Sequence, residues 1–323
     1  MKININKLLM QAERANKNGQ HIEAKKVYEE ILNVYPKNSQ ARKGILGLGK
    51  ISTNDTIQKN LTKEQINSVI ALYNNGKFQE AVDSIKALNK DHPNVPLLFN
   101  LLGACHKSLG QIDAALQMLE TATKIKPDYA EAYFNQGVIL KGIGRLEEAV
   151  ELYKKAISLN PNYPDAHNNL GNTFKDLGMY DEAIESYEWA LAYKPNFEVV
   201  QLNLGIIYSE FDQESAIKHY KKAIEIKSDY SEAYFNLGSV FRHLGRKNES
   251  IKSYEKAIEI KPDYVDAHKN LSAMKFYKKN DPQIKHMQLL LDNKHLNDQD
   301  HIALNFALAK VNEDLENNDD FFR

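Results

Sequence analysis

Two groups of residues in this chain have types and spacings that catalysis or ligand binding would use. Residues 44–50 read Gly-Ile-Leu-Gly-Leu-Gly-Lys, which matches seven of the eight positions of a phosphate-binding loop. The eighth position needs a hydroxyl to ligate magnesium, and Ile51 stands there instead. The residues just before the loop also continue a helical pattern rather than a strand, so we interpret residues 39–50 as half of a helical repeat.

Possible metal ligands gather near the carboxyl end, where His295, Asp298, Asp300 and His301 are close in sequence. Residues 297–300 also have the pattern of a helix N-cap, which is the interpretation we favour. Cys105 occupies a position that other repeats fill with Ala, Ile, Thr or Val, so we expect its thiol in the core. We therefore predict no catalytic activity, metal or cofactor.

Composition narrows the class of protein. The 323 residues contain 42 basic and 43 acidic side chains, a net charge of −1, which argues against nucleic acid or a membrane surface as a partner. A single cysteine and the lack of a long apolar run favour a soluble, cytoplasmic protein. With only 9 prolines and 15 glycines, the composition favours helices over a turn-rich sheet.

An internal repeat predicts the architecture. Prolines recur every 34 residues at Pro127, Pro161 and Pro195, a period that indicates stacked helical units. Seven units follow from this phase: residues 5–38, 62–95, 96–129, 130–163, 164–197, 198–230 and 231–264. A glycine near position 15 breaks each unit into two helices. A proline near position 32 ends the second helix.

Small and large residues alternate between fixed positions of the repeat. Position 8 is glycine in five units, position 20 is alanine or serine, and position 24 is tyrosine in four units (Tyr153, Tyr187, Tyr220 and Tyr254). We expect the large side chains to fill the space that the small ones leave between two helices.

These positions resemble the pattern of the tetratricopeptide repeat (TPR) over about four fifths of the chain. The resemblance implies an all-α fold, a right-handed α-solenoid of helix hairpins whose first helices line a concave face. We predict a first TPR plus a half-repeat helix at 1–50, a linker at 51–60, six consecutive TPR units at 61–264, and a capping helix with a non-repeat helical tail at 265–323.

The tail suggests a second resemblance. Residues 281–284 and 304–310 look like the connector that precedes the catalytic domain of bacterial TPR-sulfotransferase proteins. The alternative function is therefore a substrate-recognition arm of a sulfotransferase or glycosyltransferase whose catalytic domain is absent from this chain. Self-association through exposed end repeats is a third possibility.

Position 6 of the first helix carries the strongest functional signal. It is asparagine in six of seven units (Asn67, Asn135, Asn169, Asn203, Asn236 and Asn270). Asparagine within a helix costs about 0.5 kcal/mol relative to alanine, so helix preference does not explain the series. Carboxamides match the N–H and C=O groups of an extended peptide. The alternative is that this asparagine belongs to the repeat consensus and bonds the neighbouring hairpin.

This face resembles the TPR superhelix of O-GlcNAc transferase. Flanking residues complete the predicted peptide-binding groove and make it both apolar and amide-lined (Phe134, Asn168, Asn172 and Phe235). No repeat pairs Lys at position 5 with Asn at position 9, so the carboxylate tails of heat-shock chaperones are poor candidates. We expect a non-catalytic scaffold that binds an extended peptide or a partner protein segment.

Overall fold

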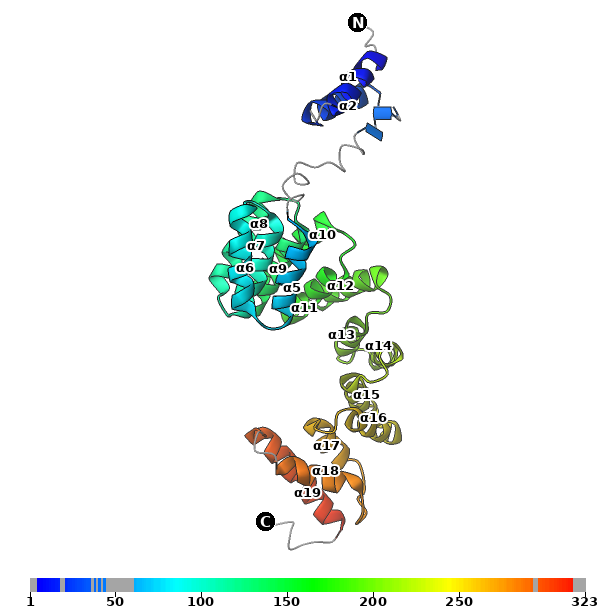
Figure 1. Ribbon diagram of the computed structural model, residues 1–323. Coiled ribbons are helices and arrows are strands. Elements are labelled where there is room, and N and C mark those ends of the chain that lie inside the picture. The colour runs from blue at the N-terminus through cyan, green and yellow to red at the C-terminus, as the bar shows by residue number, and fades with distance from the viewer. Residues whose placement is uncertain are drawn as a thin grey trace. The chain divides into compact units, whose positions relative to one another are not determined.

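The computed structural model describes residues 5–17, 21–35, 38, 40–41, 43–44, 61–292 and 296–315. Across these residues the chain is all-helical, with 17 α-helices and no strand, which confirms the predicted fold class (Figure 1). The chain divides into two compact units, Met1–Ile139 and Leu140–Arg323, with the boundary inside one helix. Each unit is described separately.

The first unit contains three antiparallel helix pairs and most of a seventh helix. Its helices are α1 (Ile5–Lys17), α2 (His21–Val34), α5 (Lys63–Asn74), α6 (Phe78–Asp91), α7 (Pro96–Ser108), α8 (Ile112–Ile125) and most of α9 (Ala130–Gly142). Buried side chains form one cluster between α1 and α2 and others along α5 to α9. Helices α5 to α8 each pack against the next in chain order, as a stack of hairpins requires.

The second unit continues the same arrangement. Its helices are α10 (Leu146–Leu159), α11 (Pro164–Asp176), α12 (Tyr180–Tyr193), α13 (Glu198–Tyr208), α14 (Gln213–Ile226), α15 (Ser231–His243), α16 (Lys247–Ile260), α17 (Val265–Ser272), α18 (Pro282–Leu291) and α19 (Asp298–Asp314). The pairs α11–α12, α13–α14 and α15–α16 pack as hairpins, and each hairpin also contacts the next helix along the chain.

Glycine makes the tight turn inside most hairpins, as predicted. Gly110, Gly144, Gly178 and Gly245 have φ between 71° and 80°, a left-handed conformation that residues with a Cβ avoid. The turn between α13 and α14 has no glycine. There Asp212 caps α14 by accepting a hydrogen bond from the backbone N–H of Ser215 at 3.1 Å.

The interlock of small and large positions is also confirmed. A Cβ placed on Gly171 would lie 2.7 Å from a ring carbon of Tyr187, and one on Gly205 would lie 2.5 Å from the ring of Tyr220. Both tyrosines are almost completely buried. Glycine at position 8 therefore lets the second helix bring its aromatic ring against the backbone of the first.

The interpretation of residues 39–50 as half a repeat stays a prediction. Residues 39, 42 and 45–50, which include most of the phosphate-loop match, lie outside the described residues. Gly44 is described, and a Cβ there would lie 2.3 Å from the Tyr28 ring, so this glycine packs directly on α2. The predicted linker at 51–60 also lies outside the described residues.

After α16 the repeat period ends, and the remaining helices form a cap. Helix α17 is only 8 residues long, and α19 packs across it and against α18. Tyr277, Met287, Leu304, Ala307 and Val311 form the buried core of this cap. The predicted N-cap is confirmed, because Asn297 Oδ1 accepts a hydrogen bond from the backbone N–H of Asp300 at 2.9 Å. The division into segments 1–50, 51–60, 61–264 and 265–323 remains a prediction.

Candidate functional site

The predicted groove residues lie on the first helices of successive hairpins. Asn67 on α5 is exposed, and Asn203 on α13 is buried. The other eight residues are half-buried: Phe134 and Asn135 on α9, Asn168, Asn169 and Asn172 on α11, Phe235 and Asn236 on α15, and Asn270 on α17. Helices α11 and α13 contact each other directly, so their asparagines belong to one continuous face.

In the first unit, Asn135 bonds to the preceding hairpin. Its Nδ2 donates to Asn100 Oδ1 at 2.8 Å, and Asn100 Nδ2 donates in turn to Glu131 Oε1 at 3.1 Å. Asn100 is 3% exposed. The side-chain Nδ2 of Asn135 is therefore used within the protein, and its Oδ1 remains as an acceptor.

The second unit has a related but richer arrangement. Asn203 Nδ2 donates to Asn172 Oδ1 at 3.0 Å and lies 3.4 Å from Asn168 Oδ1. The buried hydroxyl of Tyr187 donates to the same Asn172 oxygen at 2.7 Å. Two donors therefore hold the Asn172 carboxamide by its oxygen, which orients its Nδ2 away from the core.

A simple rule explains which asparagines bond within the protein. Asn135 and Asn203 follow repeats that have asparagine at position 5, namely Asn100 and Asn168. Asn169, Asn236 and Asn270 follow repeats with Phe134, Leu202 and Phe235 at that position. Within the described part of the chain, no side-chain hydrogen bond engages Asn169, Asn236 or Asn270.

The members of the asparagine series therefore differ in their hydrogen bonds. Asn135 and Asn203 bond the preceding hairpin, whereas Asn169, Asn236 and Asn270 keep both the donor and the acceptor of their carboxamides available. Asn172 presents a donor and Asn203 an acceptor, because their opposite ends are held inside. Adjacent donors and acceptors of this kind complement the C=O and N–H groups of an extended backbone.

Aromatic side chains support the α15 part of this face. Phe235 contacts the ring of Tyr254 at 5.7 Å and that of Tyr264 at 4.9 Å between centroids. Ser239 lies 3.1 Å from the Tyr254 hydroxyl, which parallels the contact between Asn172 and Tyr187. In both repeats the hydroxyl of the buried tyrosine at position 24 thus contacts the side chain at position 9 of the first helix.

The other predicted positions have structural roles. Cys105 is 1% exposed, and burial raises the pKa of its thiol, which agrees with a core position. His167 and His268 are buried, and the Nε2 atom of each donates to a proline carbonyl, Pro161 O at 3.0 Å and Pro262 O at 2.9 Å. Burial lowers the pKa of both imidazoles.

The four residues whose side chains could be metal ligands, for which the sequence favoured a helix N-cap, are only partly described. His295 lies outside the described residues, and Asp298, Asp300 and His301 belong to the first turn of α19. Among the residues that the structure describes, no group of three His, Cys, Asp or Glu side chains has the geometry of a metal site.

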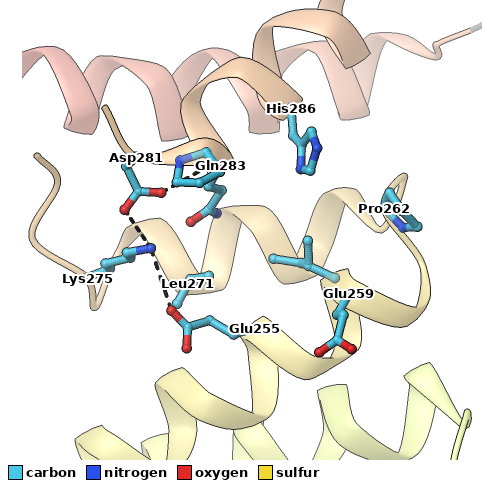
Figure 2. A pocket seen from close by; sticks show the side chains of 10 residues that line it. Glu255, Glu259, Pro262, Leu271, Lys275, Asp281, Gln283 and His286 are labelled. Atoms are coloured by element: carbon cyan, nitrogen blue, oxygen red, sulfur yellow. Dashed lines mark hydrogen bonds and ion pairs between the residues drawn. The ribbon is translucent and has the colours of Figure 1, made fainter. Parts of the chain in front are cut away.

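A cleft between α16, α17 and α18 was not predicted from the sequence. Its volume is about 470 Å³, and Ile258, Pro262, Leu271 and Pro282 give it apolar walls. Figure 2 shows Lys275 reaching both Asp281, at 2.7 Å, and Glu255, at 3.6 Å. Asp281 also caps α18 by accepting from the backbone N–H of Gln283 at 3.0 Å. The Asp-Pro pair at 281–282 is a helix-start signal, with Asp281 as the N-cap and Pro282 as the first residue of α18.

A buried polar network lies behind this cleft. Tyr277 donates its hydroxyl to Gln283 Oε1 at 2.8 Å, and Gln283 Nε2 lies 3.3 Å from His268 Nδ1. Because His268 Nε2 donates to the Pro262 carbonyl, its Nδ1 is the acceptor for Gln283. Lys275, Asp281, Gln283 and His268 thus connect α16, α17 and α18 through polar contacts.

None of the described helices is both long enough and apolar enough to span a bilayer. Comparison with known proteins gives three family matches. A family described as TPR repeat matches residues 103–144, 139–178 and 212–245, and two families described as tetratricopeptide repeat match residues 164–197 and 231–264. The last two ranges coincide with repeats assigned from the sequence. No curated protein matches the chain.

Two solved structures with TM-scores above 0.5 share this fold. The C-terminal part of a TPR repeat-containing protein from Cytophaga hutchinsonii has 19% identity and a TM-score of 0.56, and covers 74% of this chain and 98% of its own. A chain of the APC/C hetero-tetramer Cut9-Hcn1 has 17% identity and a TM-score of 0.55, over 93% of this chain and 55% of its own. MamA is also similar, with 28% identity and a TM-score of 0.45, and the match covers 50% of this chain and 95% of MamA.

Proposed function

Because this chain is an all-α solenoid of tetratricopeptide repeats, we propose that it is a non-catalytic protein-interaction scaffold that binds an extended peptide segment along its asparagine-lined face. The observation that supports this proposal is the division of the carboxamides just described. Asn135 and Asn203 form hydrogen bonds that stabilise the contact with the preceding hairpin. Asn169, Asn236 and Asn270 form no such side-chain bond with a described residue, so packing gives no reason for asparagine there.

The chemistry of this face favours recognition of a backbone over recognition of side chains. The first helices α11, α13 and α15 carry an asparagine at position 6, so a segment lying across them meets the donor and the acceptor of Asn169 and Asn236 and the acceptor of Asn203. Phe235, which is half-buried, adds an apolar contact at position 5. An extended segment of mixed sequence fits this combination better than a strongly charged one.

The decisive variant is Asn169→Ala combined with Asn236→Ala, because neither carboxamide has a partner within the described residues. Binding of a random extended-peptide array by the purified protein is the measurement. We expect the double variant to lose most of the peptides that the original protein retains, with its thermal unfolding unchanged.

A matched control is Asn160→Ala combined with Asn248→Ala, at exposed positions on the second helices α10 and α16 or at their ends. The control protein should retain the same peptides as the original protein. Equal retention by the Asn169 and Asn236 variant would refute the proposed role of this face.

A further inference from the structure

Helix α12 has an exposed aromatic surface that the repeat fold does not require. Trp189, the one tryptophan of the chain, is 49% exposed, and Tyr193 is 37% exposed. The two rings stack on each other with centroids 6.1 Å apart, and His167 of α11 stacks on Tyr193 at 5.7 Å. This stack on the second helix shares no residue with the asparagine-lined face.

The neighbouring repeats show that folding does not need tryptophan at this position. Position 26 of the repeat is Thr121, Lys155, Lys222 and Lys256 in other units, and only the 164–197 unit has an aromatic residue there. Trp189 leaves about half of its surface in water at a position where these units have threonine or lysine. Its presence among polar equivalents therefore points to contact with another molecule.

The charge of α12 is equally unusual. The helix contains four acidic residues, Asp181, Glu182, Glu185 and Glu188, and no basic residue. All four are exposed, and no basic side chain in the described part of the chain forms an ion pair with any of them. Helices α8, α10, α14 and α16 each contain or adjoin lysine or arginine residues that pair with their carboxylates.

Aromatic rings and carboxylates share one side of α12. Glu182, Glu185, Trp189 and Tyr193 are spaced by three, four and four residues, so they form one row along the helix. Residues four apart in a helix are separated by about 6 Å along its axis. Alternate residues of an extended peptide are separated by about 6.7 Å and point the same way.

We propose that the row Glu182–Glu185–Trp189–Tyr193 is a docking site for an extended, arginine-containing segment of a partner protein. A guanidinium group stacks on a tryptophan ring and forms paired hydrogen bonds with a carboxylate, so one arginine uses both chemistries of the row. Lysine lacks the planar group that does both. Phosphate backbones and anionic lipid surfaces are repelled by the same four carboxylates.

The test uses a fluorescein-labelled peptide of six Arg-Ser repeats at low ionic strength, and fluorescence polarisation gives its affinity. The unlabelled peptide should quench or shift the emission of Trp189, which is the sole tryptophan reporter. A Lys-Ser peptide of the same length should bind several-fold more weakly. A titration with no saturable change in either signal would overturn the proposal.

Two variants separate the contribution of the Trp189 ring to binding from that of the carboxylates. Trp189→Thr introduces the residue that another repeat has at this position, so the hairpin should fold normally, and we expect about tenfold weaker binding. Glu182→Gln combined with Glu185→Gln should weaken binding to a similar degree. Circular dichroism melting of each variant confirms that the helices are intact.

Matched controls test whether the effect is local. Phe276→Ala removes another exposed ring, which is 72% exposed in the cap. Asp113→Asn combined with Glu120→Gln removes two carboxylates from α8 and changes the net charge equally. Both controls should bind within twofold of the original protein. If Trp189→Thr binds equally well, or if the α8 control loses as much affinity as the α12 variant, the site is not on α12.

Discussion

Gly171 of α11 lies against Tyr187 of α12 so closely that a Cβ on the glycine would be 2.7 Å from ring carbon Cε1 and 3.1 Å from the carbonyl oxygen of Ala183. The ring and the backbone of α12 thus occupy the space that any other residue would need. This contact sets the distance between the two helices of the hairpin, and it allows the Tyr187 hydroxyl to reach Asn172 at 2.7 Å.

Gly171→Ala is therefore expected to destabilise the protein. Alanine favours helix over glycine by about 1 kcal/mol, but displacing a buried ring costs about 1 to 3 kcal/mol, so we expect a net loss. Urea unfolding measures the change. Gly142→Ala is the control, since a Cβ there meets no atom within 4 Å, and it should not lower stability. Unchanged unfolding of the Gly171 variant would show that the hairpin spacing is wrong.

Asparagines of the series should differ in their contribution to stability. Asn203→Ala removes the bond to Asn172, so we expect a loss of about 1 kcal/mol in the free energy of unfolding. Asn236→Ala removes no bond to a described residue and replaces asparagine by a better helix former, so its unfolding free energy should stay the same or rise by about 0.5 kcal/mol. Denaturant titration of both variants decides this, and equal losses would contradict the assigned bonding.

Buried histidines make stability depend on pH. Burial lowers the pKa of His268 below its ordinary value of 6.5, because the folded state disfavours the charged imidazolium. The unfolded chain therefore binds more protons than the folded one as pH falls below about 6.5, and the free energy of unfolding decreases there. His167 and His219 are shifted in the same direction and add to the slope.

The variant His268→Tyr tests this, since Tyr133 and Tyr234 occupy the equivalent position of other repeats. Urea midpoints at pH 7 and pH 5 give the pH dependence. We expect the decrease between these values to be smaller in the variant than in the original protein, whatever its absolute stability. An unchanged decrease would mean that His268 takes no part.

The stability of the C-terminal helices α17 to α19 should depend on Asp281, which is the N-cap residue of α18 and pairs with Lys275. Asp281→Ala removes the hydrogen bond to the Gln283 N–H and the 2.7 Å ion pair, and we expect a loss of about 2 kcal/mol. Hydrogen exchange should show faster exchange in α18. Asp263→Ala, at an exposed position before α17, is the control and should leave both measurements unchanged.

Local patterns were sufficient to predict the hairpins. Each depends on contacts within about 34 residues: a glycine at a turn such as Gly178, a proline at the start of α11, and a small residue opposite a large one. A repeat presents these signals several times in the same phase, so the helix pairs, the close contact of Gly171 with Tyr187 and the cap at Asn297 could all be expected.

Other features depend on which side chains the folding of successive repeats brings together. Position 6 appears nearly uniform in sequence, yet Asn203 bonds to Asn172 and Asn168 of the preceding hairpin. Asn236 bonds to no amide, because the preceding repeat has Leu202 and Ile206 at the positions equivalent to Asn168 and Asn172. The cleft behind Lys275 and the stack of Trp189 on Tyr193 also escaped prediction.

The sequence by itself determined the repeat, its helix pairs and the residues that their interlock requires, since those depend on backbone conformation and on volumes at fixed spacing. Only the tertiary structure decided which carboxamides bond internally, where α18 and α19 close the stack, and which aromatic rings remain in water. These depend on distances between separate helices, and a hydrogen bond or a buried contact exists only when packing brings its two partners within a few ångströms.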